Sequence, residues 1–198
     1  MAPPPLAQPP ALDLEPCSLR GATPGDAEAL RAFKRQALGE TEYLLQGLED
    51  FDDRIESERD LIGRFLSQPN CRLWLAALPS GRVIGLASVV GGHLHRTNHV
   101  GTMSVAVLRR HWRRGVASRL MRTAMEWARD GGALHKLTLQ VHASNHAARE
   151  LYRHLGFVEE GLLRGEARVG QNYEDLVPMG LWLSKGPVQN SDQVGLGA

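Results

Sequence analysis

Cysteine, excess charge of either sign and long apolar runs are all scarce in this sequence. Its 198 residues include two cysteines, Cys17 and Cys71, too few for a disulfide framework and without the paired spacing of a zinc site. The 23 basic and 22 acidic side chains give a formal net charge of +1, which provides no overall attraction to nucleic acid or anionic membranes. No stretch approaches the ~18 apolar residues that cross a bilayer. We therefore expect a cytoplasmic protein that binds neither nucleic acid nor a membrane.

The two ends of the sequence differ in composition from its middle. Residues 1–16 are rich in proline and have neither the basic start nor the continuous apolar stretch of a signal peptide. Residues 185–198 are polar and contain glycine. We expect both segments to be disordered tails. No internal repeat or low-complexity linker divides residues 17–184, whose length suits one α/β domain with a full hydrophobic core.

Hydrophobic periodicity and turn signals divide the middle of the chain into strands and helices. Strands are expected over residues 17–21, 72–78, 82–90, 100–108, 136–141, 157–163 and 175–183. Helices are expected over residues 23–38, 53–67, 115–130 and 145–155, and residues 39–50 stay unassigned. This order predicts an antiparallel meander followed by strand, helix, strand, helix, strand. The expected fold is α/β, a mixed sheet of about six to seven strands flanked by about four helices.

A basic turn opens the third of these helices. Arg113 and Arg114 precede Gly115 and the small residue Ala117, directly after the strand expected over residues 100–108. The first amides of a helix lack internal partners and their dipoles point outward, so such a helix start binds anions, above all phosphates. Small residues let a diphosphate approach the backbone. The competing interpretation is that Gly115 is only an N-cap and that the arginines form a solvated surface.

A second pattern follows about thirty residues later, in a helix that ends in Leu-Gly-Phe. Asn145, Ala148, Tyr152, Gly156 and Phe157 fit Asn-x-x-Ala-x-x-x-Tyr-x-x-x-Gly-Phe. Together with the basic turn, it resembles the two cofactor-binding motifs of the GNAT superfamily of N-acetyltransferases. The branch most similar contains spermidine and ribosomal-protein N-terminal acetyltransferases. The resemblance implies the GNAT fold and transfer of an acetyl group to a primary amine of a small molecule, a peptide N-terminus or a lysine.

The same resemblance implies acetyl-coenzyme A as cofactor and indicates which residues hold it. The family's first motif, Gln/Arg-x-x-Gly-x-Gly/Ala, matches from Gly115 to Ala117, while Trp112 stands at the Gln/Arg position. Relatives splay two parallel strands before this turn, and the pantetheine arm binds the exposed strand backbone. The expected cofactor-binding residues are Val105, Ala106, Val107, Arg113, Arg114, Gly115, Val116, Ala117, Ser118, Asn145, Ala148 and Tyr152.

Tyr152 is also the expected catalytic acid, because its family counterpart lies near the cofactor sulfur. A phenol with an ordinary pKa near 10 stays protonated at neutral pH and can donate a proton to a thiolate. The alternative is a tyrosine that only packs on an amphipathic helix. His99, just before the strand expected over residues 100–108, is the candidate base, directly or through water.

His93, His95 and His99 also raise the question of a metal site. Their spacing would place them on one face of a continuous strand. However, the intervening Thr97-Asn98 is typical of a turn, and no carboxylate or cysteine completes a ligand set. We therefore expect a solvated group of histidines and no metal.

The acceptor pocket is predicted from the family resemblance alone. Glu42 lies in the unassigned segment where relatives often place acceptor-site residues, although surface charge is its simpler interpretation. Tyr173 and Asp175 lie in a connection where the related branch carries an aromatic residue and an acid, although Asp175 also suits a turn. Many relatives form homodimers, so a homodimer is the expectation here.

Two other functions fit parts of the sequence. A non-catalytic module that binds acyl-coenzyme A would keep the phosphate-binding turn but lack a working acceptor site. A protein associated with nucleic acid would use the cluster of Arg109, Arg110, Arg113 and Arg114. The near-zero net charge and the lack of a recognition motif argue against the second alternative.

Overall fold

One eight-stranded sheet runs through residues 16–183, the part of the chain that the computed structural model describes. The order is β1-β2-β3-β4-β5-β8-β6, and β7 also pairs with β8. The strands are β1 (Ser18–Gly21), β2 (Cys71–Ala77), β3 (Val83–Gly91), β4 (Val100–Val107), β5 (Lys136–His142), β6 (Val158–Glu159), β7 (Leu163–Val169) and β8 (Asn172–Trp182). Apart from Pro16, the predicted tails lie outside the described residues. The predicted mixed α/β architecture is confirmed.

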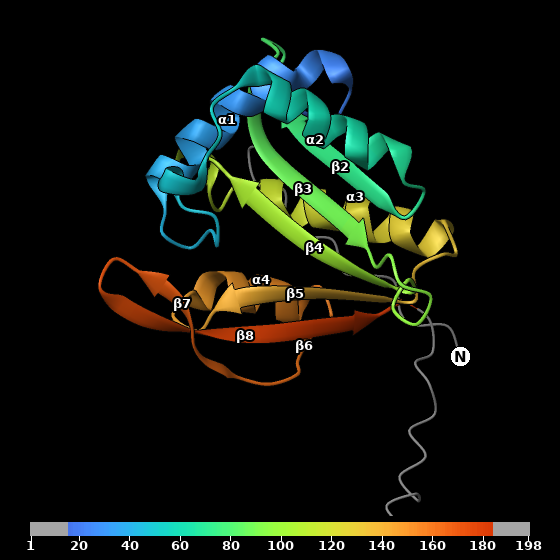
Figure 1. Cartoon of the computed structure of the whole chain (residues 1–198), viewed down its shortest axis with the longest axis vertical. Coiled ribbons are helices and arrows are strands. Elements are labelled where there is room, and N and C mark those ends of the chain that lie inside the picture. Colours follow the sequence, from blue (N-terminus) through green and yellow to red (C-terminus); the bar gives the residue numbers. More distant parts are fainter. Residues whose placement is uncertain (1–15, 184–198) are drawn as a thin grey trace, which may run out of the picture.

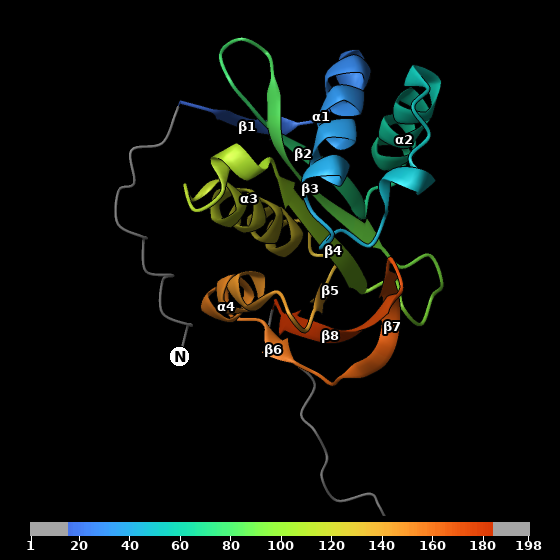
Figure 2. The same cartoon turned by 90° about the vertical axis from the view of Figure 1, so that its left-hand side faces the viewer.

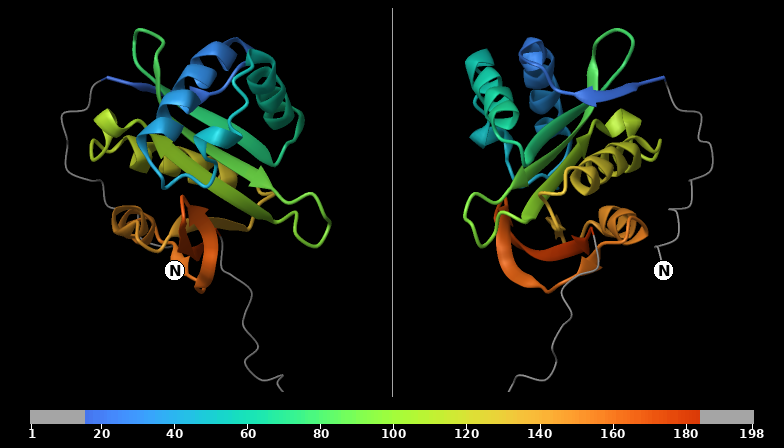
Figure 3. Two further views of the ribbon diagram at one scale, coloured as in Figure 1. Left: turned by 60° about the vertical axis from the view of Figure 1, so that its left-hand side comes forward. Right: turned by 90° about the vertical axis from the view of Figure 1, so that its right-hand side faces the viewer.

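Within these residues four α-helices cover the sheet, two on each face (Figures 2 and 3). They are α1 (Ala27–Glu40), α2 (Ile55–Ser67), α3 (Val116–Asp130) and α4 (His146–His154), with short 3-10 helices η1 (Pro24–Asp26), η2 (Leu48–Asp50) and η3 (Arg109–His111). A side chain at Gly85 of β3 would touch Leu120 and Val116 of α3. Odd-numbered residues of β3 therefore face α3, and even-numbered residues face α1 and α2. None of the helices in the described range has the length and apolar character needed to cross a membrane.

β4 and β5 form a parallel pair that separates after three residue pairs (Figure 1). Val100–Thr102 lie opposite Lys136–Thr138, and the register goes no further. β4 stays paired with β3 as far as Val107, and β5 stays paired with β8 as far as His142. Because each strand is held by its other neighbour, the two diverge toward their carboxyl ends and leave facing edges without a partner.

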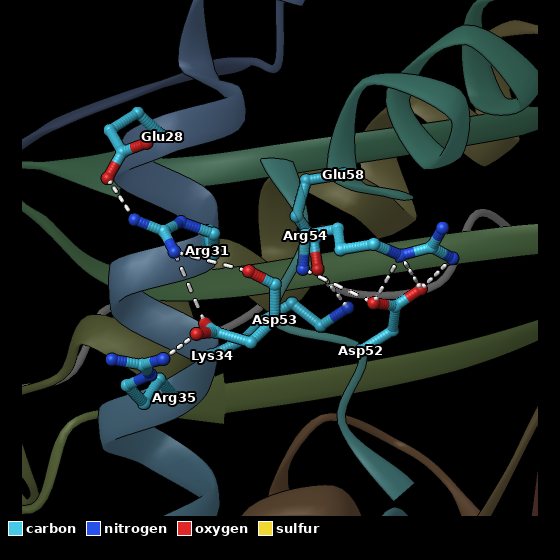
Figure 4. A network of polar contacts seen from close by, with 8 residues as sticks. All are labelled: Glu28, Arg31, Lys34, Arg35, Asp52, Asp53, Arg54 and Glu58. Carbon is cyan, nitrogen blue, oxygen red and sulfur yellow. Dashed lines mark hydrogen bonds and ion pairs between the residues drawn. The ribbon is translucent and has the colours of Figure 1, made fainter. Parts of the chain in front are cut away.

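Ion pairs connect α1 to α2 and to the segment just before it (Figure 4). Lys34 of α1 binds Glu58 of α2 at 2.7 Å, and Glu58 is almost completely buried. Arg31 of α1 reaches the carboxylate and the backbone carbonyl of Asp53 at 3.4 and 3.2 Å. These contacts connect the helix before the loop over residues 41–52 to the residues that follow it. Most of this loop falls in the stretch 39–50 that was unassigned from the sequence.

The region before the last strand differs from the prediction. The expected strand over residues 157–163 is only the two-residue β6, and the expected connection contains β7. β6 and β7 both pair with the 11-residue β8, at different points along it. β7 has few large apolar side chains and is mostly exposed, so the hydrophobic pattern did not reveal it. The described sheet therefore has eight strands where six to seven were expected.

Candidate active site

The diverging edge of β4 presents unpaired backbone groups to β5. The N–H of Leu108 donates to the Ile84 carbonyl on β3 at 3.0 Å. Because backbone groups alternate in direction along an antiparallel strand, the N–H and C=O groups of Val105 and Val107 point to the other side, toward β5. The pairing with β5 extends only as far as Thr102. An extended polar chain could take the place of the missing strand here.

A cavity of about 680 Å³ surrounds this divergence and reaches both faces of the sheet. On the face of α1 and α2 it is lined by side chains of β3, β4, β5 and β8 and by the start of the loop over residues 41–52, including Tyr43. On the other face it reaches Tyr152 of α4 and Met121 of α3. Two groups approaching from opposite sides of the sheet can therefore meet between β4 and β5.

Tyr152 is buried at the side of the cavity nearest α4. Its ring packs at 6.1 Å from the ring of Phe157, the last residue of the second motif. No hydrogen bond joins its hydroxyl to another residue within the described range. Burial raises the pKa of Tyr152 to about 12, because the phenolate would lose its hydration. The side chain is therefore a protonated donor at neutral pH.

Asn145 caps the helix that carries this tyrosine. Its side-chain oxygen accepts a hydrogen bond from the N–H of Ala148 at 3.1 Å, at the first turn of α4. The capped turn follows directly on the end of β5, since the N–H of Asn145 donates to the carbonyl of His142 at 2.9 Å. The cap uses the amide oxygen and leaves the N–H donors of the same side chain for a ligand.

The basic turn has an unusual backbone. Arg113 has a φ of 56°, the one non-glycine residue with positive φ in the described range, and Gly115 follows with a φ of 73°. Both values belong to the left-handed region, which a non-glycine residue adopts at an energetic cost. α3 then begins at Val116, so the N–H groups of Val116, Ala117 and Ser118 lie in its first turn without intrahelical partners. Beside them the side chains of Arg113 and Arg114 are exposed.

Trp112 has a specific structural role in this turn. Its indole N–H donates to the carbonyl of Val107 at 2.6 Å, and the guanidinium of Arg109 lies 5.9 Å from its ring. The Val107 carbonyl is therefore engaged by the protein, whereas the Val107 amide and both backbone groups of Val105 have no strand partner in β5. The tryptophan fastens the turn to the end of β4.

The candidate base His99 does not line the cavity. It precedes β4 at the end where β4 and β5 are still paired, and its ring is 6.2 Å from that of His135. His93 and His95 are exposed in the turn-rich connection between β3 and β4. No three His, Cys, Asp or Glu residues between 16 and 183 form a group that could hold a metal ion. The role of His99 stays a prediction.

The three predicted acceptor residues also lie outside the cavity lining. Glu42 is exposed, and Tyr173 is 74% exposed near the turn between β7 and β8. The Asp175 carboxylate accepts a hydrogen bond from the N–H of Gly165 at 2.8 Å, which joins β7 to β8. Tyr43, next to Glu42 in the sequence, does line the cavity, and its ring lies 5.9 Å from that of the buried His142.

Glu160 was missed from the sequence and is the one carboxylate that lines this cavity within the described residues. Its backbone N–H donates to the Pro178 carbonyl at 2.9 Å, and a side chain at Gly180 would collide with its carboxylate. Gly180 pairs with Thr138, the last residue of β5 that is paired with β4. Glu160 therefore lies at the point where β4 and β5 separate, and its carboxylate binds Lys136 at 2.7 Å.

Comparison with known proteins identifies this arrangement. A family model described as the acetyltransferase (GNAT) family matches residues 36–157, more than half of the chain. The chain belongs to the GNAT family. Spermidine N(1)-acetyltransferase of Vibrio cholerae is 31% identical over 104 residues, which cover 52% of this GNAT protein and 58% of that enzyme. An uncharacterized N-acetyltransferase of Bacillus subtilis is 24% identical over 78% of this chain and 86% of its own length.

Solved structures have the same fold as this GNAT protein. An acetyltransferase of the GNAT family from Streptococcus pneumoniae has a TM-score of 0.81 and 29% identity, over 85% of this chain and all of that one. A Salmonella typhimurium protein solved with acetyl-CoA has a TM-score of 0.77 and 19% identity, over 89% of this chain and 99% of that one. The Vibrio cholerae spermidine N-acetyltransferase, solved with CoA and spermine, has a TM-score of 0.71 and 23% identity, over 85% of this chain and 96% of that one.

Proposed function

We propose that this GNAT protein transfers an acetyl group from acetyl-CoA to a primary amine. The observation that carries the proposal is the unpaired backbone edge of β4 beside the protonated, buried Tyr152, inside a cavity open to both faces of the sheet. The similar proteins solved with acetyl-CoA or CoA support the choice of cofactor.

The residues present fit such a cofactor. The first-turn N–H groups of α3, from Val116 to Ser118, would bind the diphosphate, and Gly115, which has no Cβ, adopts the positive φ of the turn that precedes them. Arg113 and Arg114 would add positive charge beside it. The Val107 amide and the backbone of Val105 would hydrogen-bond the pantetheine arm as a strand does, with Asn145 adding an amide donor.

The chemistry needs a proton removed from the amine and a proton given to the leaving sulfur. Acetyl-CoA, when bound, supplies the acetyl group as a thioester. Tyr152 would donate its phenolic proton to the sulfur as the carbon–sulfur bond breaks and would regain a proton from solvent. Glu160 would accept the proton of the attacking amine, directly or through water, as the carbon–nitrogen bond forms. We prefer Glu160 to His99 for this role because it lines the cavity.

Tyr152→Phe and Glu160→Gln test the two roles separately. Each should lower kcat by about two orders of magnitude, because each removes one proton-transfer group. Acetyl-CoA should still bind with a Kd within about threefold of the wild type, since neither group holds the diphosphate. His99→Ala should leave kcat nearly unchanged. Tight cofactor binding without turnover in the wild type would favour the non-catalytic acyl-coenzyme A module.

A peptide amine and a small-molecule amine both remain acceptors under this proposal. The homodimer and the cytoplasmic location stay predictions from the sequence. Glu42, Tyr173 and Asp175 also stay predictions for the acceptor site, and Tyr43 and Gln140, which line the cavity, are better placed to touch an acceptor.

A further inference from the structure

The edge of β5 that faces β4 also has backbone groups without a strand partner. Just after β5, the N–H of Ala143 donates to the Asp175 carbonyl on β8 at 2.8 Å. The backbone groups of odd-numbered β5 residues therefore bond to β8, and those of even-numbered residues face β4. The pairing with β4 extends only as far as Thr138. The N–H and C=O of Gln140, two residues further, thus have no partner in β4, and Gln140 is exposed and lines the cavity.

The side chain of Gln140 lies on the face of the sheet that α1 and α2 cover. Thr138 lies opposite Thr102 of β4, which points to the same face as the even-numbered residues of β3, and Gln140 follows on that face. Its carboxamide has no hydrogen-bond partner among the described residues, whereas Ser88 and Ser104 in the same wall bond to each other at 2.6 Å. A carboxamide can donate to and accept from the amide of a ligand at the same time.

No strong base lines the cavity within the described residues. The ionisable side chains among its lining residues are Lys34, Tyr43, Tyr152 and Glu160, without a histidine. Lys34 is held in an ion pair by Glu58 at 2.7 Å. Glu160 is the single lining carboxylate, and Lys136 already balances its charge at 2.7 Å. The cavity therefore offers neither an unpaired carboxylate that would stabilise the reacting amine as an ammonium ion nor a strong base that would deprotonate it.

The basicity of the acceptor's own amine then decides how readily it reacts. A lysine-like alkylamine has a pKa near 10.4, so about one molecule in 2,500 is the free base at pH 7. The α-amino group of a peptide has a pKa of about 7.7 to 8.0, so roughly one molecule in ten is the free base. An α-amino acceptor thus presents about 250-fold more of the reactive form, and it carries a carbonyl group next to the amine.

We propose that the acceptor is an α-amino amide, such as the N-terminus of a peptide, and that Gln140 recognises the amide beside the reacting amine. This inference rests on the acetyl transfer proposed above, and the bonds formed and broken are the same. Phe33 of α1 and Phe65 of α2 line the cavity from the helical layer, where they can pack against an apolar side chain on the same acceptor.

The spacing of the groups along β5 suits such an acceptor. The Glu160 carboxylate lies over Gly180, which pairs with Thr138 at the point where β4 and β5 separate. Gln140 follows two residues along β5, a rise of about 7 Å. An α-amine and its adjoining carbonyl can bridge this separation with one hydrogen bond at each end. The amine would then lie at Glu160, and the carbonyl would accept from the N–H groups of Gln140.

The test compares L-leucinamide with isopentylamine, which has the same apolar body and lacks the amide. Steady-state acetylation of each is measured with the full chain and saturating acetyl-CoA. At pH 7 the kcat/KM of leucinamide should be at least about 100-fold higher. Between pH 7 and pH 9 this ratio should fall about tenfold, because the free-base fraction rises about 100-fold for isopentylamine and about tenfold for leucinamide. Ionisations of the enzyme cancel in the ratio.

Gln140→Ala separates recognition of the amide from basicity of the amine. The variant removes the carboxamide and keeps the backbone, and it should lower the leucinamide-to-isopentylamine ratio of kcat/KM by about tenfold at every pH. Gln171→Ala, in the exposed turn between β7 and β8, removes the same group outside the cavity and should leave the ratio unchanged.

L-leucylglycinamide distinguishes the two sources of an α-amino amide. A kcat/KM at or above that of leucinamide would support the inference and indicate a peptide N-terminus as the acceptor. A much lower value, with leucinamide still preferred to isopentylamine, would support it and indicate a small α-amino amide.

The remaining outcomes separate this inference from the proposed function. Equal or faster acetylation of isopentylamine than of leucinamide at pH 7 would overturn the inference while acetyl transfer to amines stands. An unchanged ratio in Gln140→Ala would also count against it. If none of the three acceptors is acetylated although acetyl-CoA binds, the proposed function fails and the inference fails with it.

Discussion

The carboxylate of Glu40, at the end of α1, accepts a hydrogen bond from the backbone N–H of Arg109 at 2.6 Å. The other oxygen of Glu40 accepts from Gln36 at 2.6 Å, and Gln36 in turn accepts from Arg82 at 3.0 Å. Arg109 begins the 3-10 helix that leads into the basic turn, and Glu40 ends the helix that leads into the cavity loop. A single contact thus joins the two halves of the candidate site.

Replacing Glu40 should therefore weaken the binding of both substrates. Glu40→Ala should raise the KM for acetyl-CoA and for the acceptor together by about fivefold each, the equivalent of one lost hydrogen bond. Glu40→Gln keeps an oxygen acceptor and should recover most of the loss. Steady-state kinetics with both substrates varied provides the measurement. A change confined to thermal stability, with both KM values unaltered, would reduce Glu40 to a structural role.

The raised pKa of Tyr152 predicts how the stability and the kcat of the enzyme change at alkaline pH. Its folded pKa of about 12 exceeds the value near 10 of an unburied tyrosine, so the folded state holds this proton more tightly. The associated stability is present in full below about pH 10 and is lost as the pH rises toward 12. We expect kcat to show no decline from Tyr152 ionisation up to about pH 10.

Two measurements check this behaviour. A pH profile of kcat should lack a tyrosine ionisation on its alkaline side, and a decline with an apparent pKa near 10 that is absent from Tyr152→Phe would contradict the burial argument. Thermal unfolding above about pH 10 should be less sensitive to pH in Tyr152→Phe than in the wild type, since the variant has no phenol to ionise at this position.

The lowered pKa of Asp26 predicts how the stability of the fold changes at low pH. Its carboxylate accepts hydrogen bonds from Arg20 at 2.6 and 2.7 Å and from Thr23 at 2.8 Å. The Arg20 guanidinium, more than any other group, holds the pKa of Asp26 well below its usual range. Because the folded pKa is lowered, the stability is present above about pH 4 and is lost as the pH falls below it.

Asp26→Asn should accordingly lower the free energy of unfolding at pH 7 by about 1 kcal/mol and flatten its acid dependence. Asp52→Asn provides the control, because Arg54 lowers the pKa of Asp52 in the same direction but the pair is on the surface, where solvent screens it. Denaturant unfolding at pH 7 and below pH 4 compares the two. An equal effect of both substitutions would contradict the structural role of Asp26.

The sequence predicted the cofactor side of the site far better than the acceptor side. The backbone around Gly115 and the capped helix from Asn145 to Tyr152 are local structures, and their signals lie in short stretches of sequence. Glu160 becomes part of the cavity only because β6 pairs with β8, a contact between distant segments that no local pattern encodes. Tyr43 lay in a segment whose conformation depends on ion pairs between α1 and α2 (Figure 4).

The strand β7 was also missed because it depends on contacts between distant segments of the chain. Its residues are nearly all exposed or half-buried, so it has no apolar alternation, and its pairing to β8 involves a register shift between Leu163 and Ala167. Gly170, with a φ of 60°, marks the tight turn before β8 and was the available signal for a hairpin. Tertiary pairing therefore determined this strand, whereas periodicity was enough for the helices α2 and α3.

Calorimetric titration with acetyl-CoA tests the candidate cofactor site most directly. The wild type should bind with a micromolar Kd. Gly115→Glu should abolish binding, because it places bulk and negative charge among the amides of the first turn of α3. Gly132→Glu is the matched control, since Gly132 has a φ of 65° and open space around it, so the backbone penalty is similar away from the turn. Retained binding in Gly132→Glu and its loss in Gly115→Glu is the predicted result; equal binding by all three proteins would contradict the assignment of the site.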